Sequence, residues 1–127
     1  MNVIFIDDDE DLNFLQQRMC VRSKIIKNFF IATSAQQTLD YLSETQISPN
    51  IIFVDLNMPV MNGFKFIEEY EKEFSTKFPN TLVYVVSSSV RENDKKTALK
   101  YASVKDFLVK PLTEDKVEEI YHQHLTS

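Results

Sequence analysis

The sequence contains little glycine and cysteine, and it has no long apolar run. Among its 127 residues there is one glycine, Gly63, and one cysteine, Cys20. One cysteine cannot form a disulfide framework within the chain, and we expect Cys20 to be a buried small hydrophobe on a helix. No apolar segment approaches the roughly 20 residues that span a bilayer, and the N-terminus lacks a basic segment followed by an apolar signal core. These absences favour a cytoplasmic protein in a reducing compartment, with no membrane contact.

The composition favours one folded domain over residues 1–127. The sequence is 43% hydrophobic, which is enough for one sizeable core. The net charge of −5 argues against direct binding to nucleic acid through phosphate contacts.

Apolar strand-like runs alternate with longer segments of helical period along the whole chain. The predicted strands cover residues 2–6, 28–32, 50–54, 81–86 and 105–109. The predicted helices cover residues 10–23, 34–45, 62–76, 91–101 and 113–125. Five repeats of strand and helix indicate an α/β fold in which helices cover both faces of a doubly wound parallel sheet. We expect the flavodoxin-like (βα)5 arrangement, with strand order 2-1-3-4-5.

Hydrophobic spacing predicts which helix faces point inward. On the first helix Leu12, Leu15 and Met19 recur at helical spacing. The apolar stripe predicted for the third helix comprises Phe64, Ile67, Tyr70 and Phe74. The only glycine, Gly63, precedes this stripe, where we expect it to permit close backbone approach or a positive φ.

Aspartates directly follow two of the apolar runs. Asp7, Asp8 and Asp9 follow Val3 to Ile6, and Asp55 follows Ile51 to Val54. In the predicted strand order these two strands are neighbours, so their acids meet in the crevice at the carboxyl edge of the sheet. Carboxylates so close together repel one another, and a hard divalent cation relieves the repulsion. The sequence therefore predicts a small acidic metal site.

Two other strand ends add a hydroxyl group and an amine to the same edge. Ser87, Ser88 and Ser89 follow the fourth apolar run, and Lys110-Pro111 follows the fifth. A cation neutralises phosphoryl oxygens, a lysine adds a point charge and a hydroxyl donates a hydrogen bond. The combination suits phosphoryl chemistry that works by positioning and charge stabilisation.

Taken together, these motifs resemble the response-regulator receiver domain of two-component phosphorelays. The similarity lies in Ile4-Phe5-Ile6-Asp7-Asp8-Asp9-Glu10, in Asp55-Leu56-Asn57-Met58-Pro59 through Gly63, and in Lys110-Pro111. It extends over essentially the whole chain, with the elements in order. One departure is Tyr101-Ala102-Ser103-Val104, where many receivers have a glycine-alanine pair.

The resemblance implies the residues of a Mg²⁺ site. Asp8 would bind Mg²⁺ directly, and Asp7 would help directly or through water. Asp55 and the backbone carbonyl of Asn57 would complete the protein ligands. Mg²⁺ keeps several waters and needs only one or two carboxylates, which suits this set.

The resemblance also implies how a phosphoryl group is accepted. Asp55 would be the nucleophile that forms an aspartyl phosphate. Lys110 would pair with Asp55 and then with the phosphoryl group. The peptide bond between Lys110 and Pro111 would be cis. Ser87 would bind the phosphoryl group; we prefer it to Ser88 because it directly follows the apolar run. Phe107 is either a switch residue, as the resemblance implies, or a plain core residue.

In functional terms, the resemblance implies a signalling protein that is not an enzyme, although it takes part in its own phosphoryl transfer and dephosphorylation. Its closest type is a stand-alone, chemotaxis-like receiver. The donor would be a histidine kinase or a histidine phosphotransfer protein, and the output would be a protein contact or onward transfer to a histidine. A phosphorylation-independent docking module of the same fold is the main alternative.

Other readings of the same acids are weaker. Asp7, Asp9 and Asp11 have the opening spacing of an EF-hand, but Leu12 and Arg18 occupy the positions of its glycine and its bidentate glutamate. The segment from Asp55 to Gly63 has no counterpart in a phosphatase of the haloacid-dehalogenase type. Asp9 or Glu10 is expected to cap the first helix, and both are expected to lie outside the chemistry.

Charged residues near the C-terminus suggest a homodimer through the fourth helix, fifth strand and fifth helix. The basic ones are Arg91, Lys95, Lys96, Lys100 and Lys105, and the acidic ones are Glu114, Asp115, Glu118 and Glu119. A solvated surface explains the same pattern, because exposed ion pairs contribute little. We expect His122 and His124 to be ordinary surface residues, because their i, i+2 spacing points them apart.

Overall fold

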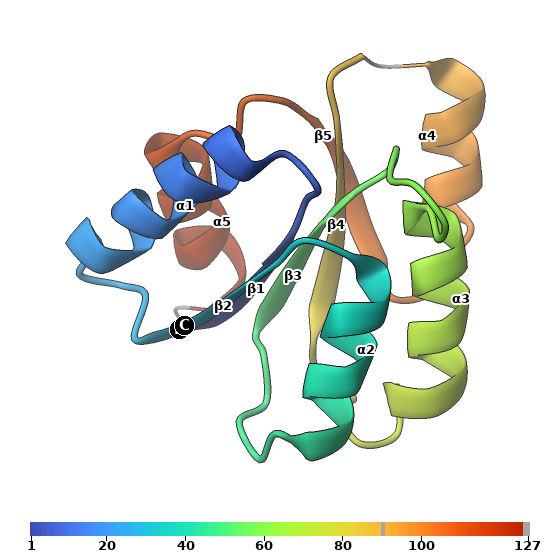
Figure 1. Ribbon diagram of the computed structural model, residues 1–127, viewed down its shortest axis with the longest axis horizontal. Helices are drawn as coiled ribbons and strands as arrows, with labels where there is room; N and C mark the ends of the chain where they lie inside the picture. The colour runs from blue at the N-terminus through green and yellow to red at the C-terminus, as the bar shows by residue number, and fades with distance from the viewer. Residues whose placement is uncertain (90, 126–127) are drawn as a thin grey trace.

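A computed structural model describes residues 1–89 and 91–125, which form a parallel five-stranded sheet between two layers of helices (Figure 1). The strands are β1 (Asn2–Ile6), β2 (Asn28–Ala32), β3 (Ile51–Asp55), β4 (Leu82–Ser87) and β5 (Val104–Val109). The helices are α1 (Glu10–Arg22), α2 (Ala35–Glu44), α3 (Gly63–Phe74), α4 (Glu92–Leu99) and α5 (Glu114–His124). Within these ranges, no helix is long and apolar enough to cross a bilayer.

The strand order is β2-β1-β3-β4-β5, which confirms the predicted flavodoxin-like topology. β1 lies between β2 and β3, with Val3 opposite Ile51 and Ile6 opposite Val54. The chain therefore leaves β1 in one direction for β2 and returns past it to form β3. This reversal brings the ends of β1 and β3 to adjacent positions at the carboxyl edge, where ligand sites of open α/β sheets form.

The central strands are buried on both faces, and their side chains alternate between two cores. Ile52 and Val54 of β3 pack with α2 and α3, whereas Ile51 and Phe53 pack with α1 and α5. Figure 1 shows the corresponding layers: α1 and α5 on one side of the sheet, and α2, α3 and α4 on the other. Double coverage explains why β1 and β3 are near-continuous apolar runs.

The predicted inner face of α1 is wrong in one position. Leu15 is 59% exposed, and the buried residues of this helix are Asn13, Gln16, Met19 and Cys20. The Asn13 side chain on this buried face donates a hydrogen bond to the Asp7 carbonyl, and Leu15 lies outward. Hydrophobic spacing did not indicate this face, because two of its four buried residues are polar. Cys20 is buried, as predicted.

On α3 the predicted stripe is incomplete. Ile67, Tyr70 and Phe74 are buried, but Phe64 is only half-buried and Phe66 is completely buried. The buried face of α3 therefore includes Phe66, which the predicted stripe omits, and leaves Phe64 at its edge. Phe64 packs instead at its edge, where its ring stacks on Tyr101 with 6.2 Å between centroids.

Element boundaries differ from the predictions by one or two residues. β3 and β4 each begin and end one residue later than predicted, because Asp55 still pairs with Val86 of β4. Helices α2, α3 and α5 start one residue later, because Ser34, Asn62 and Thr113 are their N-caps. Asp9 caps α1 by accepting from two backbone N–H groups, as predicted.

Candidate functional site

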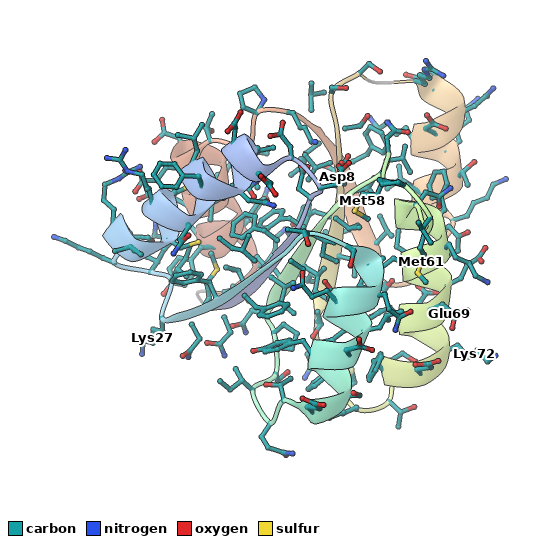
Figure 2. All side chains as sticks on the ribbon, viewed as in Figure 1. Asp8, Lys27, Met58, Met61, Glu69 and Lys72 are labelled. Carbon is teal, nitrogen blue, oxygen red and sulfur yellow. The ribbon has the colours of Figure 1, made fainter. Side chains whose placement is uncertain are left out.

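The carboxyl ends of four strands converge on one small area of the sheet edge. Asp7 and Asp8 follow β1, Asp55 ends β3, Ser87 ends β4, and Lys110 follows β5. In Figure 2, Asp8 and Met58 both lie at this edge, and Lys27, which precedes β2, lies toward the opposite one. The topology thus assembles residues from distant parts of the sequence.

Three carboxylates form the centre of the site. Asp7, Asp8 and Asp55 each place one oxygen within 4.8 Å of the others; Asp7 and Asp55 are buried, and Asp8 is exposed. An all-oxygen donor set with a solvent-facing side suits Mg²⁺, which prefers carboxylates and retains waters. The residues present therefore fit the cation that the sequence predicted.

Asn57, the fourth predicted ligand residue, lies on the loop that leaves β3. Its side chain is exposed, and its backbone N–H donates to Asp55 Oδ1 at 3.2 Å. This bond fixes the first turn of the loop against the Asp55 carboxylate. The carbonyl of Asn57 thus belongs to a segment that is tied directly to the acid cluster.

Lys110 forms ion pairs with two of the three acids, Asp7 and Asp55. Its Nζ lies 2.7 Å from Asp7 Oδ2 and 3.4 Å from Asp55 Oδ1, and its side chain is 20% exposed. Its backbone N–H donates to the Ser87 carbonyl at 2.8 Å, and its bond to Pro111 is cis, as the resemblance implied. Burial alone lowers the pKa of Lys110, but the hydrogen bond and charge of Asp7, with Asp55 in support, raise it overall.

Asp55 ionises with difficulty. Burial and the negative charge of Asp7 raise its pKa from 3.8 to about 6, against the opposing effects of Lys110 and the Asn57 N–H. One lysine compensates only part of the charge of two buried carboxylates. A cation held by Asp7, Asp8 and Asp55 would favour the ionised form of Asp55, which is the form that can act as a nucleophile.

Ser87 is the serine that β4 places at the site. It is 2% exposed, lies opposite Val109 in the sheet, and accepts a bond from the Ser89 N–H at 3.4 Å. Ser88 and Ser89 are exposed beyond the strand end. Below the site, Phe107 is 6% exposed and packs in the core on the α2 and α3 side, a position compatible with either of its two predicted roles.

The path of the loop from Asp55 to Gly63 explains why residue 63 is a glycine. A Cβ on Gly63 would lie 2.9 Å from both the Asp55 carbonyl oxygen and Leu56 Cα, so close approach is the reason for glycine here. The positive φ in this loop belongs to Val60, at 68°, where the Met61 N–H bonds back to the Pro59 carbonyl. This tight turn folds the loop back toward α3.

Two methionines of the loop pack against the hydrophobic core. Met58 is 8% exposed, and Met61 is half-buried against the same core, near the start of α3 (Figure 2). Their packing anchors the loop on both sides of the Val60 turn. The loop is therefore held in place against the core, while Asp8, at the end of the neighbouring strand, is exposed to solvent.

Sequence reasoning missed two features of α1. Asn13 and Gln16 are buried behind the acids, and Phe14, Leu15 and Val21 are exposed on the outer face. A signal was available: Asn13, Gln16 and Cys20 are spaced by three and four residues, which is the period of one helix face. Polar amides on that face hid the pattern.

Comparison with known proteins identifies relatives over nearly the whole chain. The profile of the response regulator receiver domain matches residues 3–122. The chemotaxis protein CheY of Thermotoga maritima is 33% identical over 88 residues, which are 69% of this chain and 68% of that protein. A two-component response regulator of Arabidopsis thaliana is 24% identical over 125 residues, 98% of this chain. The chain spans only 31% of the length of that plant protein.

The fold comparison agrees with the sequence comparison. The crystal structure of a two-component response regulator from Cytophaga hutchinsonii superposes with a TM-score of 0.88 and 28% sequence identity. The superposition covers 99% of this chain and 97% of the other. The similarity therefore includes every strand and helix that contributes to the site.

Proposed function

This chain belongs to the response regulator receiver domain family, and we propose that residues 1–127 form one receiver that acts as a phosphorylation-dependent switch in two-component signalling. Receivers are signalling proteins and not classical enzymes. The observation that carries the proposal is the pairing of Asp55 with Lys110 beside Asp7 and Asp8. A reactive carboxylate, a lysine and a cation-binding pair are the groups that acceptance of a phosphoryl group requires.

In the proposed reaction, an Asp55 carboxylate oxygen attacks the phosphorus of a phosphohistidine donor. The new O–P bond forms as the P–N bond breaks, and the imidazole leaves with the electron pair of that bond. When bound, Mg²⁺ neutralises charge on the phosphoryl oxygens. Lys110 stabilises the same oxygens, and it already lies within 3.4 Å of Asp55.

The hydroxyl of Ser87 donates a hydrogen bond to the phosphoryl group in this proposal. Ser87 is joined to Lys110 through its carbonyl, so movement of one strand end is transmitted to the other. Phosphorylation then favours a second arrangement of the Ser87 end of β4, and Phe107, which lies opposite Val85 of that strand, is the residue to follow as a reporter. The change is a shift between two conformations with different affinities for a partner.

The exposed apolar residues of α1 support a docking role for the phosphodonor. Phe14 and Leu15 are each 59% exposed, and Val21 is 71% exposed. Next to them, a groove of about 370 Å³ runs between α1 and the segment that follows Lys110, lined in part by Leu15 and Pro111. A histidine kinase or phosphotransfer protein bound there brings its phosphohistidine close to Asp55 in the cytoplasm.

The docking role can be separated from the chemistry. Leu15→Ser with Val21→Ser is expected to slow transfer from a phosphorylated histidine phosphotransfer protein of the same organism. Phosphorylation by acetyl phosphate should be unchanged, because the acids are untouched. Ile47→Ser, at a site 41% exposed elsewhere on the molecule, is the matched control. Equal transfer to both variants would refute docking on α1.

Self-association through α4, β5 and α5 has weaker support. The acids of α5 are partly engaged within the molecule, since Glu114 pairs with Arg22 at 3.1 Å and Glu119 with Lys116 at 3.6 Å. These side chains are exposed, so the pairs contribute little free energy. Sedimentation before and after phosphorylation tests the dimer directly, with a doubled mass as the positive result.

The central test is phosphorylation by acetyl phosphate with Mg²⁺, measured by intact mass. We expect the parent to gain one phosphoryl group, and Asp55→Asn and EDTA-treated samples to gain none. No gain in the parent would favour the phosphorylation-independent docking module. Sustained hydrolysis of a generic phosphomonoester would instead favour a phosphatase of the haloacid-dehalogenase type.

A further inference from the structure

The inner face of α1 is polar where it passes the acid cluster, although the surrounding core is apolar. Asn13 and Gln16 are each 7% exposed. In the part of the chain that the structure describes, Asn13 Oδ1 and Gln16 Oε1 are buried and accept no hydrogen bond. A buried amide oxygen without a donor costs free energy. Hydrophobic packing alone does not explain amides at these two positions.

The other end of the Asn13 amide makes a short contact with the site. Its Nδ2 donates to the backbone carbonyl of Asp7 at 2.7 Å, across the turn between β1 and α1. The Asp7 N–H donates to the Ala32 carbonyl of β2 at 3.1 Å. Both backbone polar groups of Asp7 are therefore held, one by the sheet and one by the helix.

The Asp7 carboxylate is fixed as well. Its Oδ1 accepts from the Asp9 N–H at 2.9 Å, which leaves Oδ2 to face Lys110 at 2.7 Å. With the backbone held, the side chain has little freedom to turn away. The repulsion between Asp7 and Asp55 would otherwise be relieved by such a turn, because like charges separate when nothing restrains them.

We propose that Asn13 is a positioning residue for the cation site, which acts through the Asp7 carbonyl and keeps the Asp7 carboxylate directed toward Asp55 and Lys110. The inference rests on the proposed function, because it concerns how Mg²⁺ is held. Asn13 does not touch the cation or the phosphoryl group. The unpaired Oδ1 is the cost of keeping an N–H donor at this place in the core.

The test compares two substitutions of buried amides on the same helix face. Asn13→Leu keeps the approximate shape of the side chain and removes the donor to Asp7, together with the unpaired oxygen. Gln16→Leu removes an unpaired oxygen of the same kind from a small cavity that Gln16 lines together with Asp7 and Asp55, but it removes no hydrogen bond to Asp7. Mg²⁺ affinity is measured by isothermal titration of metal-free protein with MgCl₂, and unfolding by urea is measured without Mg²⁺.

We expect Asn13→Leu to raise the Mg²⁺ dissociation constant about tenfold, as is typical for loss of a group that orients a metal ligand. Gln16→Leu should bind Mg²⁺ as the parent does. Asn13→Ala, which introduces no larger group, serves as a second variant if the leucine does not fit. A purely structural role predicts changes in urea stability with no change in Mg²⁺ affinity.

Three results would overturn the inference. Parental Mg²⁺ affinity in the folded Asn13 variants would show that Asp7 needs no such support. An equal loss in Gln16→Leu would assign the effect to repacking of α1. Absence of Mg²⁺ binding in the parent would refute the proposed function itself and the inference with it, so the two failures are distinguished by the parent protein alone.

Discussion

Replacing Asp55 by asparagine should stabilise the metal-free protein near neutral pH. Asp55 is 5% exposed and lies beside the negative charge of Asp7, so its ionised form is disfavoured in the fold. Asparagine has the same shape and carries no charge. The substitution removes the desolvation of a carboxylate and its repulsion by Asp7, both of which oppose folding.

The expected size follows from the pKa of Asp55. A rise from 3.8 to about 6 corresponds to about 3 kcal/mol, at about 1.4 kcal/mol per pKa unit. This pKa already includes the attraction of Lys110, which keeps its shorter contact with Asp7 at 2.7 Å in the variant, whereas burial of the uncharged asparagine amide still costs some free energy. We therefore expect a net gain of about 2 kcal/mol at pH 7.5 in EDTA, below the limit set by the pKa.

The pH dependence of this gain has a definite sign. Since the pKa of Asp55 is higher in the folded state, the native protein binds a proton more tightly than the unfolded chain does. That contribution to stability is complete below about pH 4 and is lost as the pH rises through about 6. The difference between variant and parent should thus be small at pH 4 and fully developed at pH 7.5.

The assay is urea unfolding followed by far-UV circular dichroism at both pH values. Asp40→Asn is the matched control, because Asp40 is exposed on α2 and its replacement removes one charge without relieving burial. Addition of Mg²⁺ at tenfold its dissociation constant should stabilise the parent by about 1.4 kcal/mol and Asp55→Asn by much less. A variant that is less stable than the parent at pH 7.5, or a difference that does not change with pH, would refute the reasoning.

Three further substitutions test other parts of the site by urea unfolding. Gly63→Ala should lose about 2 kcal/mol, since the new Cβ would lie 2.9 Å from the Asp55 carbonyl oxygen; parental stability would contradict this close approach. Val60→Asn should gain up to about 1 kcal/mol, because asparagine tolerates a φ of 68° better than a β-branched residue, and a loss would argue against that backbone. Lys110→Met should lose about 3 kcal/mol in EDTA at pH 7.5, since it leaves two buried carboxylates without their cation; equal stability would show that the lysine does not compensate them.

The fold was predictable because its signals are local and repeated. Continuous apolar runs such as Ile51 to Val54 identify strands that are covered on both faces, and alternation with helical segments leads to a parallel sheet. The order of the strands then follows from the few arrangements available to five such units. Boundaries shifted by a residue because pairing across the sheet, as between Asp55 and Val86, depends on the partner strand.

The rotation of α1 was not predictable in the same way. Leucine spacing predicted Leu15 inside, but the structure buries Asn13 and Gln16 and exposes Leu15, and Asn13 donates a hydrogen bond to the Asp7 carbonyl. Such a bond joins a helix to the strand end before it, and neither hydropathy nor period records it. The same bond is why the positioning role of Asn13 became visible only in three dimensions.

The sequence by itself determined the class of fold and placed acids and a lysine directly after strands, in a combination that suits phosphoryl chemistry, because residue type and position after a strand are properties of the chain. Only the tertiary structure decided how these groups interact. Burial and the charge of Asp7 raise the pKa of Asp55 to about 6 although Lys110 lies 3.4 Å away, and α1 and β2 hold Asp7 from opposite sides. Burial, distance and helix rotation arise from packing between distant segments, so they exist only once the sheet has formed.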